Sequence, residues 1–211
     1  MEILDILKKV GAIMTDDHFV YTSGKHGSVY VNKDALYLHI NEASEVGRLF
    51  AEKYKDLDIE VVVAPALGGI VLSQWTAYHL SKMKYKKILG VYTEKDSEGN
   101  QILTRGYDKL VAGKKVLIVE DITNTGGSVK KVMNSVRAVN ADVVAVCTMI
   151  NRNPEEVTSG TMGAPFSSLG IFKAEAFEES DCPLCKQNIP INTSVGHGKK
   201  YLAKKQNAGD R

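Results

Sequence analysis

The chain has 211 residues, of which 44% are hydrophobic and 25% charged, a composition typical of a globular protein long enough for one domain with a full core. Its formal net charge is +2, and its basic and acidic residues are mixed along the sequence, which does not favour a nucleic-acid-binding protein. The first residues resemble no signal peptide, and no apolar run has the length of a transmembrane helix. We therefore expect a cytoplasmic protein with neither a nucleic-acid nor a membrane partner.

Apolar spacing predicts two helices in the N-terminal part of the chain. The first begins near Ile3 and ends at Gly11, and the second begins near a capping residue at Asn41 and buries Phe50. Between them, residues 19–21 and 29–31 read as two short strands in a hairpin-like region. Such a region can fold over a binding site as a hood.

From residue 61 onward, buried strands alternate with helices. The predicted strands are 61–64, 88–92, 116–119 and 143–150, and helices are predicted at 70–80 and after residue 128. This order indicates an α/β fold, with a parallel sheet flanked by helices. We predict one domain over residues 1–187, with a hood over about 1–40 and a core over about 41–187. Residues 188–211 are predicted to be a weakly ordered basic tail.

The most informative segment follows the third of these strands. Val116 to Val119 form an apolar run without alternation, which is typical of a central strand buried on both faces. Glu120 and Asp121 come next. Carboxylates only accept hydrogen bonds, so this pair suits a vicinal diol such as the 2- and 3-hydroxyls of ribose. The alternative is that both acids merely flank a turn.

A loop of small residues follows the acidic pair and precedes a helix. It offers hydroxyl groups and unhindered backbone amides, which form an anion-binding nest at a helix N-terminus. No nucleoside-triphosphatase loop and no dinucleotide-binding fingerprint occurs in the chain. The sequence therefore predicts a site for a ribose 5-phosphate group. Its candidate residues are Glu120, Asp121, Ile122, Thr123, Asn124, Thr125, Gly126, Gly127 and Ser128.

Residues 116–128 resemble the phosphoribosyl pyrophosphate signature of the type I phosphoribosyltransferases. Phe19 to Tyr30 (FVYTSGKHGSVY), Ala64 to Gly69 (APALGG) and Ile150 to Arg152 resemble the orotate-specific members of that family. The resemblance implies transfer of a phosphoribosyl group from phosphoribosyl pyrophosphate to orotate in pyrimidine biosynthesis, with Mg²⁺ as cofactor and a homodimer as assembly. A purine-base transferase and a non-catalytic regulator that senses phosphoribosyl pyrophosphate and binds nucleic acid are the alternatives.

Two further loops carry candidate residues for the donor. Gly68 and Gly69 precede a helix, and their amides would bind on the pyrophosphate side. The resemblance implies a non-proline cis peptide in this loop. Residues 93–108 form a polar insertion that is longer than a strand-to-helix connection needs, so we predict a lid. By resemblance, Lys95 and Arg105 of this lid act catalytically on the pyrophosphate, together with Asp121.

The acceptor base has its own candidates. The resemblance assigns orotate binding to Arg152, Tyr30, Val31 and Asn124, and a guanidinium group suits a planar anionic base. The alternative for Arg152 is a surface ion pair with Glu155 or Glu156. The chain departs from the family pattern in its lid, which lacks the lysine-rich, histidine-containing sequence of well-known orotate enzymes, and at three single positions. Gly68 stands where those enzymes have lysine, Thr22 stands where many have a basic residue, and Asn124 replaces the usual threonine of the signature.

The three cysteines do not form a secreted disulfide framework, so reduced thiols are expected. Cys182 and Cys185 form a C-P-L-C string that could supply half of a zinc site, with His197 as a conceivable third ligand. Structural zinc needs four ligands, and the string supplies only two. We therefore predict a turn at Pro183 and no metal ligands among the protein's side chains.

Overall fold

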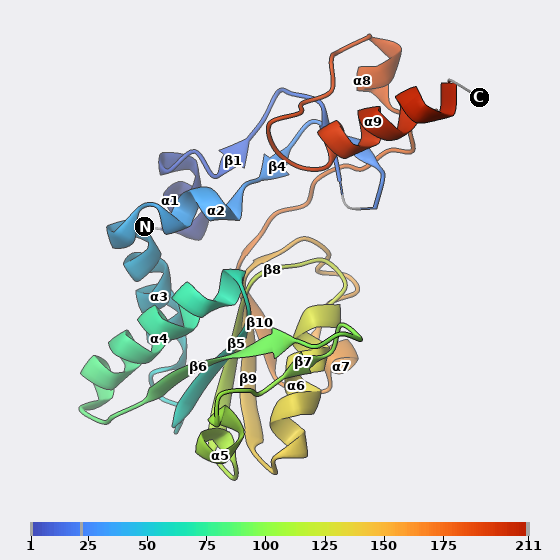
Figure 1. Cartoon of the computed structure of the whole chain (residues 1–211). Coiled ribbons are helices and arrows are strands. Elements are labelled where there is room, and N and C mark those ends of the chain that lie inside the picture. Colours follow the sequence, from blue (N-terminus) through green and yellow to red (C-terminus); the bar gives the residue numbers. More distant parts are fainter. Residues whose placement is uncertain (1, 22, 210–211) are drawn as a thin grey trace. The chain divides into compact units, whose positions relative to one another are not determined.

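The computed structural model describes residues 2–21 and 23–209 of the chain (Figure 1). Thr22 of the predicted hood and residues 210–211 of the predicted tail lie outside this part. The chain divides into two compact units. The core unit comprises Met1–Val10 and Lys33–Phe172, and the small unit comprises Gly11–Asn32 and Lys173–Arg211. This division differs from the one we predicted, because the first helix belongs to the core unit and residues 173–187 join the N-terminal segment of the small unit.

The core unit contains a six-stranded sheet with the order β10-β9-β8-β5-β6-β7. All neighbouring strands are parallel except β7, which runs antiparallel to β6. The predicted α/β class with a parallel sheet is thus confirmed. The strands are β5 (Val61–Pro65), β6 (Leu89–Lys95), β7 (Gln101–Ile102), β8 (Lys115–Thr123), β9 (Asp142–Asn151) and β10 (Phe166–Ile171).

The apolar runs of the central strands are buried on both faces of the sheet. Every residue of β5 is buried, and successive side chains of a strand point to opposite faces. Val61, Val63 and Ile118 join the buried cluster that includes the apolar face of α6, while Val62 and Leu117 point to the other face. Helices α3 and α4 cover that face (Figure 1).

The helices of the core unit follow the predicted order with some shifts in their ends. The second predicted helix is α3, and it begins one residue before Asn41, with His39 at the N-cap and the Ala43 amide donating to the His39 carbonyl. None of the described helices combines the length and the apolar character that crossing a bilayer requires. The helices are α1 (Ile3–Lys9), α2 (Lys33–Tyr37), α3 (Ile40–Tyr54), α4 (Gly68–Lys84), α5 (Tyr107–Val111), α6 (Gly127–Ala138) and α7 (Ser159–Met162).

The small unit contains two pairs of very short antiparallel strands and two helices. Strand β1 pairs with β4, and β2 pairs with β3. The predicted strands at 19–21 and 29–31 are found as β2 and β4, and an antiparallel pair flanks Ser23 and Gly24 as expected. The second strand of that pair is β3, however, and residues 30–31 pair with β1. The elements are β1 (Ile13–Met14), β2 (Phe19–Val20), β3 (His26–Gly27), β4 (Tyr30–Val31), α8 (Pro183–Lys186) and α9 (Gly198–Gly209).

The segment that we predicted as a weakly ordered tail contains α9. The helix is anchored to the N-terminal segment of the small unit, because the His197 amide donates to the Val20 carbonyl at 2.9 Å and the Tyr201 ring packs edge-on against His26. These contacts join residues far apart in the sequence, and the polar composition of the tail gives no sign of them.

Candidate active site

The carboxyl ends of β5 and β8 form the switch point of the sheet. Strand β5 pairs with β6 on one side and with β8 on the other. The chain therefore continues to one side of β5 with β6 and to the other side with β8, and the strand order reverses between β5 and β8. Ligands of open parallel sheets bind in the crevice at such a point. The loop before α4 and the loop before α6 leave the sheet here, which brings together two of the predicted loops.

The predicted diol-binding carboxylates lie near the carboxyl end of β8. Strand β8 runs two residues past them and ends at Thr123, which pairs with Asn151 of β9. Glu120 and Asp121 are therefore part of the strand, whereas we predicted that they follow it. Both are buried, with exposed fractions of 6% and 3%. The extra strand length holds the two acids on a rigid element.

Lys33 supplies a cation to this acidic pair. Its Nζ lies 2.5 Å from Oδ2 of Asp121. Burial by itself lowers the pKa of Lys33, but the Asp121 carboxylate outweighs this effect and the pKa lies above its ordinary value. Sequence reasoning missed this residue. The two partners are 88 positions apart, and no local pattern around Lys33 indicates a functional role.

Glu120 has a strongly perturbed pKa. Burial raises its pKa well above the ordinary value, and the neighbouring Asp121 carboxylate raises it further. The Asp121 amide donates to Oε1 of Glu120 at 3.0 Å, which opposes the shift without cancelling it. Carboxylates with strongly shifted pKa values at the carboxyl ends of strands are a physical sign of a functional site.

The loop between β5 and α4 packs closely against the acidic pair. The Ala66–Leu67 peptide is cis, as the family resemblance implies. A Cβ atom at Gly68 would overlap Oδ2 of Asp121 and would lie 2.6 Å from Nζ of Lys33. A side chain at this position would therefore displace Asp121 or Lys33, and the ammonium group of Lys33 lies directly beside Gly68.

Tyr37, which lies on α2 with Lys33, contacts the first turn of α4. Its hydroxyl donates to the Gly68 carbonyl at 2.5 Å. Burial raises the pKa of Tyr37, and the negative charges of Asp121 and Glu120 raise it further, so the phenol keeps its proton. The backbone at Gly68 and Gly69 is thereby held with its amides at the start of a helix, where an anion is favoured.

The loop from Asn124 to Gly126, where we predicted an anion-binding nest, directly precedes α6. The Gly126 amide donates to Oγ1 of Thr123 at 3.1 Å. Gly126 has a φ of +73° and its Cβ position is 2.7 Å from the Met162 sulfur, so the turn requires glycine. The exposed members of the loop and the first turn of α6 are Asn124, Thr125, Gly127 and Ser128.

The predicted lid is a hairpin formed by the end of β6 and by β7. Its turn contacts α6, where the exposed Lys131 donates to the Gly99 carbonyl at 2.5 Å. Lys95 is exposed on this hairpin. Arg105 lies just beyond it and pairs with Glu94, with 2.9 Å between Nη2 and Oε1. In the structure, therefore, Arg105 contacts a carboxylate of its own hairpin, and its catalytic role stays a prediction.

Two groups of acceptor candidates lie in different units. The Arg152 amide donates to the Thr123 carbonyl at 2.9 Å, which brings the residue after β9 to the end of β8, as we predicted. Tyr30 and Val31 form β4 of the small unit. The roles of these residues in binding orotate stay predictions.

Comparison with known proteins agrees with this geometry. Residues 32–159 match the phosphoribosyl transferase domain family. The orotate phosphoribosyltransferase of Thermotoga maritima is 38% identical over 198 residues, which cover 94% of this chain and all of that protein. The chain belongs to the phosphoribosyltransferase family. The orotate phosphoribosyltransferase of Thermoanaerobacter sp. is 35% identical, with 90% of this chain and 94% of that protein covered.

A solved structure from the orotate phosphoribosyltransferases has the same fold. The crystal structure of the Mycobacterium tuberculosis H37Rv enzyme superposes with a TM-score of 0.65 at 22% identity, covering 81% of this chain and 96% of that one. At this level of identity the likeness concerns the fold. The phosphoribosyltransferase fold explains why the candidate residues gather at the carboxyl ends of the strands.

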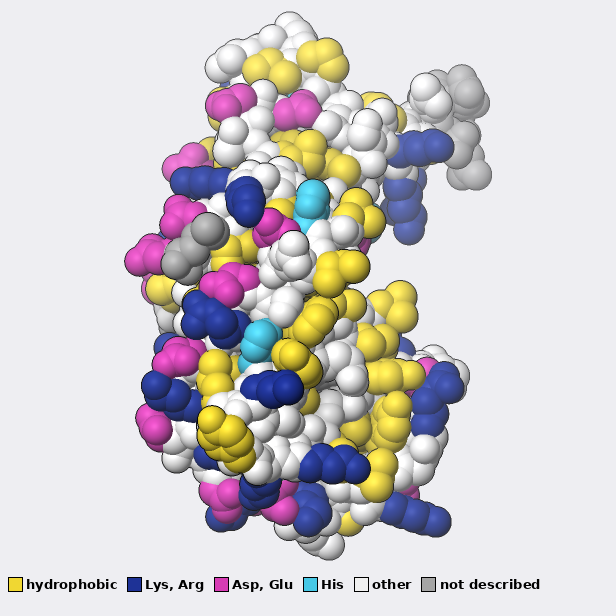
Figure 2. All heavy atoms as spheres, turned by 90° about the vertical axis from the view of Figure 1, so that its left-hand side faces the viewer, with side chains coloured by type: hydrophobic (Ala, Val, Ile, Leu, Met, Phe, Trp, Pro, Cys, Tyr) yellow, Lys and Arg dark blue, Asp and Glu magenta, His cyan; other side chains and the backbone are white. Residues whose placement is uncertain are grey.

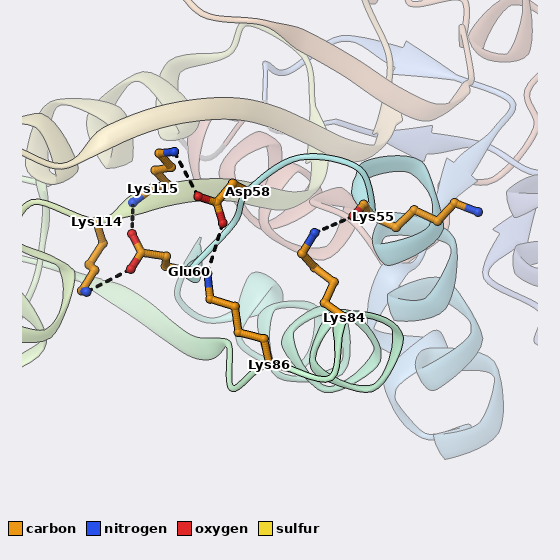
Figure 3. A network of polar contacts seen from close by, with 7 residues as sticks. All are labelled: Lys55, Asp58, Glu60, Lys84, Lys86, Lys114 and Lys115. Carbon is orange, nitrogen blue, oxygen red and sulfur yellow. Dashed lines mark hydrogen bonds and ion pairs between the residues drawn. The ribbon is translucent and has the colours of Figure 1, made fainter.

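Lys86, Lys114 and Lys115 of this phosphoribosyltransferase chain lie at the opposite end of the sheet, where β5 and β8 begin. Asp58 pairs with Lys86 and Lys115 at 3.1 and 3.0 Å, and Glu60 pairs with Lys114 at 2.9 Å (Figure 3). Basic and acidic side chains are likewise intermixed on the face shown in Figure 2. Each of these three lysines has an acidic partner, which weakens the case for a phosphate-binding surface at this end of the sheet.

Proposed function

We propose that the protein transfers the 5-phosphoribosyl group of phosphoribosyl pyrophosphate to orotate, giving orotidine 5'-phosphate and pyrophosphate. The observation that carries this proposal is the buried Glu120–Asp121 pair directly before the nest of α6, at the switch point of the sheet. The reaction would belong to pyrimidine biosynthesis, as for the relatives named orotate phosphoribosyltransferase.

The donor half of the site follows from charge and position. The carboxylates of Glu120 and Asp121 would accept hydrogen bonds from the ribose hydroxyls. The amides of the loop from Asn124 to Ser128 would receive the 5-phosphate at the positive end of α6. The sugar would thus be held at both ends, with its anomeric carbon presented to the acceptor.

Departure of pyrophosphate requires neutralisation of negative charge. The anomeric carbon gains positive character, as in glycoside chemistry, and pyrophosphate leaves as a stable anion, so no protein group needs to protonate it. Lys33, paired with Asp121 in the structure, and the amides of Gly68 and Gly69 would lie on this side. Lys95 and Arg105 would approach the same anion when the hairpin moves toward it.

The donor set is compatible with Mg²⁺. Glu120 and Asp121 present carboxylate oxygens, the ligands that Mg²⁺ prefers, and Mg²⁺ in phosphate-transfer sites uses few protein ligands. When bound, the ion would neutralise oxygens of the pyrophosphate and the ribose. The chain itself would hold the diol through Glu120 and Asp121, and Lys33 would position Asp121 through their ion pair.

The acceptor half is proposed from the family pattern and from one contact. Arg152 is fixed by its amide to the end of β8, beside the nest, and its guanidinium group would bind a carbonyl and the carboxylate of orotate. Tyr30, Val31 and Asn124 would complete the base site. We further propose a cytoplasmic homodimer, in which the hairpin acts on the neighbouring subunit.

A single assay distinguishes these functions. Full-length protein is incubated with phosphoribosyl pyrophosphate, Mg²⁺ and one base at a time, and pyrophosphate release is measured. We expect release with orotate and none with hypoxanthine or adenine. Release with a purine but not with orotate would contradict the acceptor, and no release with any base, together with tight donor binding, would favour the regulatory protein.

A further inference from the structure

Four potential metal ligands of the small unit come together in one cluster. One ligand atom from each of His18, His26, Cys182 and Cys185 lies within 4.8 Å of all the others. Nε2 of His18 lies 2.8 Å from Nδ1 of His26. The Cys185 sulfur lies 3.7 Å and 3.3 Å from these two nitrogens, and the Cys182 sulfur lies 3.8 Å from Nε2 of His18. None of the four residues has a role in the proposed reaction.

We propose that this cluster binds a structural zinc ion through two imidazole nitrogens and two thiolates. Tetrahedral zinc with ordinary bond lengths holds its nitrogen and sulfur ligands about 3.3–3.8 Å apart. The three nitrogen–sulfur distances above fall in this range, the two imidazole nitrogens would have to separate slightly, and the remaining ligand pairs lie within 4.8 Å. Two cysteines and two histidines form one of the common closed ligand sets of structural zinc.

The orientation of His18 favours metal binding. Its Nδ1 lies 2.7 Å from the Ile189 carbonyl, which can only accept a hydrogen bond, so Nδ1 carries the proton. The lone pair of Nε2 then points into the cluster. Zinc-bound histidines commonly donate their second ring N–H to a carbonyl in this way.

The backbone explains how the four ligands meet. In the β2–β3 pair, Val20 lies opposite His26, and His18 lies two residues before Val20, so both histidines point to the same face. Cys182 is the N-cap of α8, and Cys185 lies in its single turn. A two-residue spacing between cysteines is usual for structural zinc.

Burial shows why the small unit would need such an ion. His18, His26 and Cys182 are exposed by only 1%, 0% and 0%. In the described part of Lys173–Arg211, Cys182 carries the only buried side chain, since the other buried residue is Gly198. Small units with little apolar core commonly depend on a metal or a disulfide. Zinc would join the two chain segments of this unit.

The cluster changes our expectation for the cysteine pair. We predicted no metal ligands, because the C-P-L-C string lacked partners other than His197. The structure supplies two different partners, His18 and His26, and His197 does not belong to the cluster. Cys182 and His18 are 164 positions apart, and seven residues separate the histidines, which is not the usual zinc-finger spacing. All three cysteines are free.

Metal analysis of the full-length protein tests the proposal. Protein made in zinc-supplemented medium and dialysed without chelator should contain about one zinc per chain by plasma mass spectrometry. Cobalt(II) in place of zinc should give a thiolate charge-transfer band and the visible bands of a tetrahedral site. Chelation followed by restored Mg²⁺ should accelerate tryptic cleavage after Lys199 and Lys200.

Variants provide matched controls. Cys185→Ser and His18→Asn should lose the zinc, whereas Cys147→Ser, a buried cysteine of β9, and His197→Asn, a histidine of the same unit, should retain it. Wild-type protein without zinc and without cobalt bands would overturn the proposal even if a variant fails to fold. Full zinc content in folded Cys185→Ser protein would overturn it too, as would a mass lower by two hydrogen atoms that maps to a Cys182–Cys185 disulfide.

Discussion

The ammonium group of Lys33 lies 2.5 Å from the carboxylate of Asp121 and joins α2 to the end of β8. Asp121 is almost fully buried, while the side chain of Lys33 is 36% exposed. The pair therefore gives a buried acid a partner that is still open to solvent on one side. This arrangement allows Lys33 to meet an incoming anion without leaving Asp121.

Replacing Lys33 with methionine should weaken both folding and donor binding. Loss of one partner of a fully buried pair costs about 3–5 kcal/mol, and the partial exposure of Lys33 reduces this to about 1–2 kcal/mol. We expect this loss in the free energy of unfolding from urea titration, together with a higher KM for phosphoribosyl pyrophosphate.

Lys33→Arg, which keeps the charge, should retain most of the stability. Lys86→Met removes a lysine from the opposite end of the sheet, where the central strands begin, and should leave the KM for phosphoribosyl pyrophosphate unchanged. A Lys33→Met protein with wild-type stability and wild-type KM would show that the pair has neither role.

Replacing Glu120 with glutamine should stabilise the folded chain near neutral pH. Because the folded-state pKa of Glu120 is raised, the folded chain binds more protons than the unfolded chain between the ordinary and the raised pKa. Stability therefore falls as the pH rises through this window. Glu120→Gln removes that fall, with a gain of about 1.4 kcal/mol for each unit of the raised pKa.

The same variant should bind phosphoribosyl pyrophosphate less well, because an amide accepts fewer hydrogen bonds than a carboxylate. Thermal unfolding at several pH values and donor titration by calorimetry check both effects. Glu42→Gln is the control, since Lys9 lowers the pKa of the partly buried Glu42 and the change should bring no gain at neutral pH. A Glu120→Gln protein that keeps the wild-type pH dependence of unfolding would contradict the assignment.

Replacing Gly126 with alanine should cost more than the same change at Gly113. Both glycines have positive φ, +73° and +68°, and alanine in this conformation costs about 1–2 kcal/mol. At Gly126 the new methyl group would also collide with Met162, whereas nothing lies within 4 Å at Gly113. We expect Gly126→Ala to be the less stable variant and the only one of the two with weakened donor binding.

Equal losses of stability for the two alanine variants, with equal donor affinity, would show that the turn before α6 tolerates a side chain. The comparison removes the general effect of a left-handed residue. What remains is the effect of close packing at the nest.

The hairpin cations should act on the chemical step. Lys95→Ala and Arg105→Ala should each lower kcat by about 10² or more if the side chain stabilises the departing pyrophosphate. Glu94→Gln releases Arg105 from its partner in the structure and should not lower kcat. A change in kcat within twofold for both alanine variants would exclude the cation role.

Mixing subunits tests whether the hairpin acts across a dimer. Lys95→Ala and Asp121→Asn proteins are each expected to be poorly active. If the hairpin serves the neighbouring site, random mixed dimers with one intact site should restore roughly a quarter of the wild-type activity. No restoration after mixing and reassociation would place Lys95 on the site of its own chain.

The central strands could be predicted from the sequence because their signal is local. The apolar run of β8 is buried on both faces, so each residue of the run is apolar and each one indicates a buried strand. Strand β10, by contrast, was not predicted. It lies at the edge of the sheet and is only partly buried, and Ser167 and Ser168 interrupt its apolar pattern.

The site likewise contains residues that the local sequence predicts and residues that only the fold brings together. The acids and the nest follow one another along the chain, so their order alone indicates a ribose phosphate site. Lys33, His18 and His26 carry no comparable local pattern, because their partners are far away in the sequence. Only the fold brings Lys33 to Asp121 and the two histidines to the cysteine pair.

Identification of the product tests the central claim most directly. Wild-type protein and the Glu120→Gln/Asp121→Asn double variant are incubated with phosphoribosyl pyrophosphate, Mg²⁺ and an equimolar mixture of orotate, hypoxanthine and adenine, and the nucleotides are identified by mass spectrometry. We expect the wild type to form orotidine 5'-phosphate alone, in equal amount to pyrophosphate, and the double variant to be slower by about 10² or more. A purine nucleotide as the product, or an unchanged rate in the double variant, would contradict the account.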